Sequence, residues 1–126
     1  MTLVDSDILV AHLRGSDRAR DWLMGLREAG RPAISVVSIA EIAGGMRAGE
    51  PRQVWRLLGS MNVKPATELI ARRAGEMMRR YRRSHAAIGL GDYLIAATAD
   101  VEGLELATLN VKHFPMFKGL RPPFSV

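Results

Sequence analysis

Apolar residues along the chain follow two different spacings, which predict two kinds of element. Short β-rich runs predict strands, and these lie at 2–4, 33–36 and 104–110, with a possible further strand in the extended link 63–66. Longer segments with apolar residues every three or four positions predict helices, and these lie at 7–13, 17–30, 38–49, 50–62, 68–86 and 89–103. The tail 121–126 contains two prolines and predicts at most an edge strand.

The alternation of short strands with helices predicts the fold class. Strands that are separated by helices pair in parallel and lie between helical layers, so the pattern indicates an α/β sandwich with a short parallel sheet. The length of 126 residues is typical of one domain, and the sequence shows no internal repeat or linker. We therefore expect a single domain over residues 1–126.

Composition narrows the classes of chemistry. The chain has no cysteine, which excludes disulfides, thiolate zinc sites and cysteine nucleophiles. It has no signal-peptide pattern and no apolar run of membrane-spanning length, so we expect a cytoplasmic protein without a membrane partner. The net charge is +5 and the sequence pI is about 10.4, which favours a polyanionic partner such as nucleic acid.

Three apolar segments each carry one carboxylate near the end of a predicted strand. Asp5 follows the first strand, Glu41 lies in the helix after the second, and Asp92 lies in the first turn of helix 89–103. Asn110 follows the last strand. Functional groups of parallel sheets gather beyond the carboxyl ends of the strands, so we expect these four residues to approach one edge of the sheet.

Each acid also has a simple structural explanation. Asp5 can cap the following helix, and Asp92 is favoured by the dipole at a helix N-terminus. Ser38 and Glu41 match a capping box, and Asp7 can be a solvated acid or support the site from behind. Packed carboxylates repel one another unless a cation lies between them. We therefore expect Asp5, Glu41 and Asp92 to bind Mg²⁺, which can generate hydroxide and offset charge on a phosphodiester.

Nearby polar residues have candidate supporting roles. Ser6 can bond a metal-bound water or cap a helix, and Ser38 is expected to cap the Glu41 helix. Thr108 can orient Asp92 or a phosphate, or be an ordinary exposed strand threonine. Asn110 can offer its amide oxygen to the metal or its waters, whereas His113 is expected to lie on the surface or behind the ligands.

The segments around these residues resemble the PIN-domain ribonucleases, in particular the VapC-type toxins of toxin–antitoxin pairs. "LVDSDILVAHLRG" resembles the family's first strand and acid, "ISVVSIAEIAGGM" its Ser/Thr-x-x-Glu segment, and "GLGDYLIAATA" its Asp-x-Leu-Ile-Ala-Ala-Thr-Ala block. "LATLNVKHFPMFKGL" resembles the closing strand and corner. The resemblance covers essentially the whole chain and implies a three-layer α/β/α sandwich, endoribonuclease activity, a Mg²⁺ or Mn²⁺ site, a homodimer and a VapB-like antitoxin.

One feature departs from the family pattern. Members often carry a further aspartate around the fourth position, where this chain has Asn110 and His113 in "NVKHF". This difference leaves open the number of metal ions and the identity of the fourth ligand.

Arginines are concentrated in predicted helix 68–86. They are Arg72, Arg73, Arg79, Arg80, Arg82 and Arg83. Helical spacing places residues 72, 79 and 83 on one face. Arginine contacts to phosphates give affinity without sequence specificity, so Arg72, Arg79, Arg80 and Arg83 are candidates to contact RNA or an acidic antitoxin tail. A solvated helix face is the simpler alternative.

Two other functions remain open on the sequence. "LVDSDIL" contains the Asp-x-Asp of a haloacid-dehalogenase-like phosphotransferase, with Asp5 as nucleophile and Asp7 as acid/base. Ile8 and Leu9 stand where a small polar turn is expected, and a suitably placed phosphate-binding lysine is lacking. The other alternative is a non-catalytic, basic RNA-binding PIN module, against which the intact Asp5, Glu41 and Asp92 argue.

Overall fold

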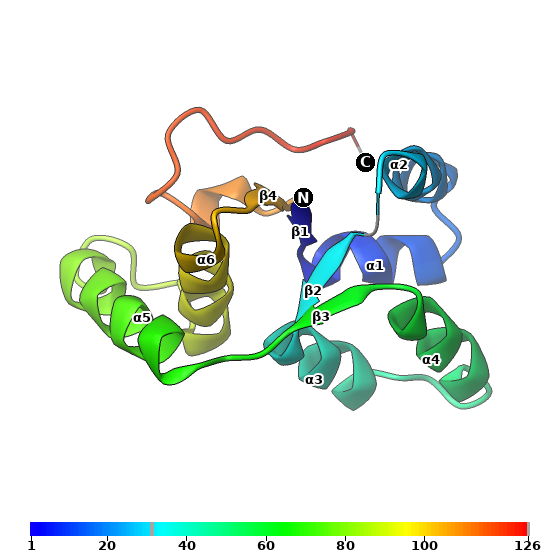
Figure 1. The fold of residues 1–126 in the computed structure, drawn as a ribbon, viewed down its shortest axis with the longest axis horizontal. Coiled ribbons are helices and arrows are strands. Elements are labelled where there is room, and N and C mark those ends of the chain that lie inside the picture. Colours follow the sequence, from blue (N-terminus) through cyan, green and yellow to red (C-terminus); the bar gives the residue numbers. More distant parts are fainter. Residues whose placement is uncertain (31, 126) are drawn as a thin grey trace.

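The computed structural model describes residues 1–30 and 32–125. Short strands alternate with helices along most of the chain (Figure 1). The elements are β1 (Thr2–Val4), α1 (Ser6–Leu13), α2 (Asp17–Glu28), β2 (Ala33–Ser35), α3 (Val36–Gly44), α4 (Pro51–Gly59), β3 (Asn62–Lys64), α5 (Glu68–Tyr81), α6 (Leu90–Glu102), β4 (Glu105–Ala107) and the 3₁₀ turn η1 (Val111–His113).

The four strands form one parallel sheet in the order β3-β2-β1-β4. Leu3 in the central strand β1 pairs with Ala33 of β2 on one side and with Leu106 of β4 on the other. The predicted strands and their parallel pairing are therefore confirmed, and the possible strand in the link 63–66 is β3 at Asn62–Lys64. The segment 121–125 is not a strand, and Val126, the last residue of the predicted edge strand, lies outside the described residues.

Side chains alternate between two hydrophobic cores, one on each face of the sheet. Leu3 and Ala33 pack with Ile70, Met77 and Tyr93 beneath α5 and α6. The neighbouring positions of the same strands, Val4 and Ile34, pack on the opposite face with residues of α1, α2, α3 and α4, among them Ile8, Leu23, Ile42 and Val54. Figure 1 shows α5 and α6 on one side of the sheet and α1, α2 and α4 on the other. This arrangement is the expected three-layer sandwich.

Helices α5 and α6 pack on the same face of the sheet. Arg73 of α5 forms an ion pair with Asp100 of α6, with 2.7 Å between Nε and Oδ2. Helix α5 ends at Tyr81, not at the predicted residue 86, because the chain turns at 82–88. Arg83 is thus outside the helix and cannot share a helical face with residues 72 and 79.

The described residues contain no helix that combines the length and the hydrophobicity needed to cross a membrane.

Candidate metal centre and active site

Asp5 lies where β1 ends and α1 begins. Its Oδ1 accepts a hydrogen bond from the Ser6 amide at 2.8 Å, so Asp5 is the N-cap of α1, as a helix-start aspartate can be. Its Oδ2 accepts a second bond, at 2.8 Å, from the Thr108 hydroxyl. The residue is only 5% exposed. The first predicted acid is therefore a buried carboxylate that accepts hydrogen bonds from the residues following β1 and β4.

Thr108 joins β4 to the acids of α1. It is fully buried, and its hydroxyl also lies 3.2 Å from Asp7 Oδ2, which accepts a further bond from the Leu109 amide at 2.9 Å. One hydroxyl proton serves only one carboxylate at a time, so Thr108 is shared between Asp5 and Asp7. Thr108 is neither an exposed strand residue nor a partner of Asp92; it orients Asp5 and Asp7.

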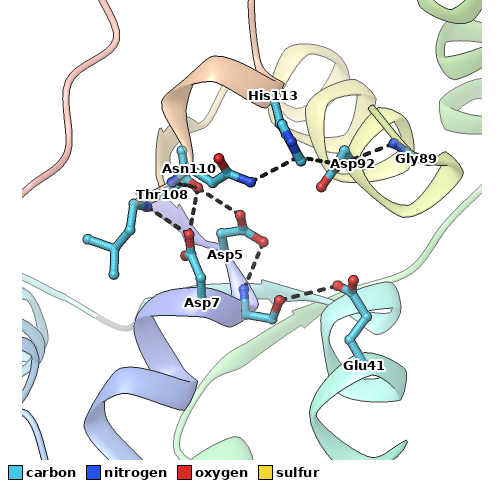
Figure 2. Close-up of polar contacts among 10 residues, drawn as sticks. Asp5, Asp7, Glu41, Gly89, Asp92, Thr108, Asn110 and His113 are labelled. Carbon is cyan, nitrogen blue, oxygen red and sulfur yellow. Dashed lines mark hydrogen bonds and ion pairs between the residues drawn. The ribbon is translucent and has the colours of Figure 1, made fainter. Parts of the chain in front are cut away.

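Glu41 projects from the middle of α3 toward the start of α1 (Figure 2). Its Oε1 accepts a bond from the Ser6 hydroxyl at 3.3 Å. The predicted capping box of Ser38 and Glu41 is wrong, because α3 follows β2 directly and its N-cap is Ser35, which accepts from the Val37 amide at 3.0 Å. Ser38 is instead buried inside the helix, and its hydroxyl has no partner among the described residues.

Asp92 lies in the first turn of α6 and faces the corner after β4 (Figure 2). Its Oδ2 is 3.3 Å from the Gly89 amide, which donates to it, and 3.1 Å from His113 Nδ1. The same imidazole nitrogen is 2.9 Å from Asn110 Nδ2. The Asn110 amide thus reaches Asp92 only through His113.

His113, which was expected on the surface or behind the ligands, lies behind Asp92, with its Nδ1 3.1 Å from Asp92 Oδ2. Its Nδ1 cannot accept from the Asn110 amide and donate to Asp92 at the same time, so the tautomer decides which contact forms. The sequence signal was the departure from the family pattern in "NVKHF". That signal located the corner, but the contact depends on η1, which turns His113 back toward α6.

Burial and mutual repulsion shift the acids in one direction. Burial first, and then the charge of Asp7, raise the pKa of Asp5 to about 7, and Asp92 adds to this shift. Burial also raises the pKa of Asp7. The pKa of Glu41 is raised by burial and by the charges of Asp92 and Asp7, against the opposing bond from Ser6. A nearby cation would relieve these penalties.

The carboxylate oxygens of the site are the ligand type that a hard divalent cation prefers, but among the described residues they are not arranged around one common ion position. Asp5, Asp7, Glu41 and Asp92 offer carboxylate oxygens, the ligands that Mg²⁺ prefers. One of them, Asp7 Oδ1, is buried without a hydrogen-bond partner among the described residues. Within the described part of the chain, no three or more His, Asp or Glu side chains are arranged to hold an ion directly. Binding therefore requires side-chain adjustment, and Glu41 Oε2 and Asp92 Oδ1 are the oxygens that make no hydrogen bond with a described residue.

The predicted RNA-contacting arginines lie apart from the carboxylates, on α5 and in the turn that follows it. Arg72 is engaged by Glu68, with 3.0 Å between Nε and Oε2, whereas Arg79, Arg80 and Arg83 are exposed.

Comparison with known proteins identifies the family. Residues 2–115 match the PIN domain. The chain is 71% identical over 126 residues to "Ribonuclease VapC10" of Mycobacterium tuberculosis (strain ATCC 25618 / H37Rv), covering all of this chain and 95% of the relative. It is 42% identical to "Ribonuclease VapC19" of the same strain, over 98% of this chain and 100% of the relative.

A solved structure agrees with the fold. The "Toxin-antitoxin complex from Klebsiella pneumoniae" contains a chain that matches with a TM-score of 0.82 at 27% identity, over 100% of both chains. The carboxylates after β1, in α3 and in the first turn of α6 thus lie in a sequence and a fold shared with VapC ribonucleases. The chain belongs to the PIN-domain family and, within it, to the VapC group.

Proposed function

We propose that this protein is a metal-dependent endoribonuclease that acts on cytoplasmic RNA as the toxin of a VapBC-type toxin–antitoxin pair. The observation that carries the proposal is the meeting of Asp5, Glu41 and Asp92 at the carboxyl edge of the sheet, in a chain 71% identical to a VapC ribonuclease. The family match gives no support to the phosphotransferase alternative.

The roles of the residues follow from their contacts. Asp5, Glu41 and Asp92 would hold Mg²⁺, for which Mn²⁺ can substitute, and Asp7 would support them. A bound ion would supply activated water and would offset charge on the phosphodiester. Thr108 fixes Asp5 and Asp7, and Ser6 directs Glu41. Asn110 competes with Asp92 for His113 Nδ1. Ser38 has no contact that would give it such a role.

The partners are proposed from the relatives. The Klebsiella structure is a toxin–antitoxin complex, which supports a VapB-like antitoxin as the protein partner. A homodimer is a further expectation for this chain. Light scattering measures its mass directly, and a monomer at micromolar concentration would contradict this part of the proposal.

The test is cleavage of a labelled RNA pool by the wild type and by Asp92→Asn, in Mg²⁺, in Mn²⁺ and in a chelator. We expect cutting by the wild type with metal only. Asp21→Asn is the matched control, because Asp21 is an exposed aspartate on α2 that pairs with Arg20, and it should cut like the wild type. Equal cutting by Asp92→Asn would refute the assigned site.

Measurements of metal binding and of covalent labelling distinguish this proposal from the two alternative functions. A non-catalytic RNA-binding module would bind the pool, would cut none of it, and would show no heat of Mn²⁺ binding in calorimetry. A phosphotransferase would trap phosphate on Asp5, which mass spectrometry of the intact protein detects. Neither result is expected.

A further inference from the structure

A cleft of about 120 Å³ opens between α1, α3 and α4, and Glu41 forms part of its wall. The three helices pack on one face of the sheet (Figure 1). The apolar lining residues are Val10, Leu13, Ile42, Met46 and Val54. Since the cleft and the carboxylate site share Glu41, a molecule bound at the site has this cleft directly beside it.

The interior of the cleft is apolar and small. Ile42 and Val54 are only 4% and 1% exposed, so they form its floor, whereas Val10 is 36% exposed and lies at its open side. Pockets that enclose a whole small molecule have about 300–1,000 Å³. The cleft therefore has room for a single flat ring or one side chain, as part of a larger ligand.

Arg14 and Glu50 give the cleft a polar edge. Arg14 Nη1 donates to Glu50 Oε2 at 2.6 Å, and the Arg47 amide donates to Glu50 Oε1, also at 2.6 Å. Both oxygens of Glu50 are thus occupied, and Glu50 holds the guanidinium in place. A guanidinium has five N–H donors, and the remaining ones of Arg14 have no partner among the described residues.

An apolar interior with fixed hydrogen-bond donors at its edge suits a nucleobase better than an apolar side chain. Bases in single-stranded RNA can leave the stack, so that proteins contact their faces and recognise their edges. A leucine or phenylalanine from a protein partner would cover Arg14 without bonding to it. Among the bases, guanine presents two acceptors, O6 and N7, which match the paired donors of a guanidinium.

We propose that this cleft binds one unpaired guanine of the RNA, next to the phosphodiester that is cut, with Arg14 bonding to the edge of the base. Val10 and Ile42 would contact the faces of the ring. This inference rests on the proposed nuclease function and adds a determinant of substrate specificity to it. Because Glu41 belongs to both the cleft and the site, a base in the cleft brings its own phosphate close to the carboxylates.

The test is equilibrium binding of four short fluorescent oligoadenylates that carry G, A, C or U at the central position, in a chelator, where no cleavage occurs. We expect the wild type to bind the guanine RNA about tenfold more tightly than the others, the usual effect of a bidentate contact to a base. Arg14→Gln should lose this preference. Arg56→Gln on α4 removes the same charge outside the cleft and should keep it.

A second variant tests the space in the cleft. Val10→Phe places a larger side chain at its open side and should weaken binding of the guanine RNA to the level of the other three. Val63→Phe makes the same substitution at an exposed valine of β3, outside the cleft, and should bind like the wild type. Thermal unfolding followed by circular dichroism checks that both variants are folded.

Three results would overturn the proposal. Equal affinity of the wild type for the four RNAs would remove the guanine specificity. A guanine preference that persists in Arg14→Gln and in Val10→Phe would place its recognition elsewhere on the chain. Binding of every RNA unchanged by Val10→Phe would leave the cleft to a side chain of a protein partner.

Cleavage in Mg²⁺ separates this proposal from the proposed function. On the guanine RNA, Arg14→Gln should raise KM about tenfold and leave kcat nearly unchanged, as expected for lost uniform binding. A wild type that prefers the guanine RNA in a chelator but cuts none in Mg²⁺ would contradict the nuclease and still support the cleft. A wild type that cuts all four RNAs equally would contradict the cleft and leave the nuclease intact.

Discussion

The carboxylate of Asp5 is costly to bury, and this cost should be visible in the stability of the metal-free protein. Its pKa is about 7 in the folded state, against an ordinary value of 3.8. The folded state therefore holds a proton that the unfolded state has released, and the free energy of unfolding falls as pH rises from about 4 to about 7.

Asp5→Asn should remove this penalty, because asparagine caps a helix as well as aspartate does. We expect the variant to be more stable than the wild type by about 1–2 kcal/mol at pH 8 in a chelator, with the difference vanishing near pH 4. Urea unfolding at both pH values measures the effect. Asp21→Asn, on the exposed face of α2, is the control. A variant less stable than the wild type at pH 8 would contradict the account.

Gly91 determines how closely α6 approaches Glu41. A Cβ at this position would lie 3.4 Å from Val37 Cγ1 and 3.5 Å from Glu41 Oε2, so alanine fits, whereas the methyl groups of valine would displace the carboxylate. Gly91→Val should therefore weaken Mn²⁺ binding about tenfold, as changes behind metal ligands commonly do. Calorimetry measures the affinity. Gly75→Val makes the same substitution in α5, where a Cβ meets nothing within 4 Å, and should bind Mn²⁺ normally.

At the scale of single residues, the positions of the acids were easier to predict from the sequence than those of the polar residues that contact them. Asp5 and Asp92 were predictable because the first follows a strand and the second opens a helix, and Glu41 because it lies in the helix that leaves the second strand. Ser38 was misassigned because Ser35, three residues earlier, is an equally good cap and the strand ends one residue sooner than predicted. His113 was expected on the surface or behind the ligands, but its partner Asp92 was not predicted, because the contact joins elements that only the folded chain brings together.

At the scale of elements, α6 and the residue directly after β4 each supply a buried threonine, Thr98 and Thr108, and the two make a matched pair. Thr108 bonds to the acids of the site, whereas Thr98 donates to the Leu94 carbonyl within α6 at 2.7 Å. Both Thr108→Val and Thr98→Val should lower the free energy of unfolding by about 1 kcal/mol, the ordinary value of such a bond. Only Thr108→Val should also slow RNA cleavage. Equal slowing by both would show that the loss reflects stability alone.

The end of α5 shows why helix boundaries are difficult to predict. Residues 68–86 are rich in helix-forming arginine, methionine and alanine, so local preference continues past the true end. The chain turns after Tyr81 because Ile88 must reach the core beneath α6. Tertiary packing thus overrides helix propensity after Tyr81.

At the scale of the whole molecule, the alternation of strands and helices was sufficient to predict a parallel sheet between helices. It could not predict the strand order β3-β2-β1-β4, since alternation alone does not say which strands are neighbours. Each strand has three residues, too few for periodicity to distinguish the two faces. The division into two cores became visible only with the structure.

A divalent ion bound among these acids should stabilise the entire fold. At a free Mg²⁺ concentration about one hundred times Kd, binding adds about 2.7 kcal/mol to the free energy of unfolding. We expect Tm to rise by several degrees on adding Mg²⁺ and to fall again with a chelator, as followed by scanning calorimetry. Asp5→Asn/Asp92→Asn should show no rise. A matched concentration of K⁺ controls for ionic strength.

The pairing of β1 with β4 also governs when the site can be completed during synthesis. Asp5 is made 103 residues before its partner Thr108, and the corner with Asn110 and His113 follows Thr108. A growing chain on the ribosome therefore carries a first acid without its supports until β4 has emerged and paired with β1. A site with this topology is therefore completed only after the last strand of the sheet has been made.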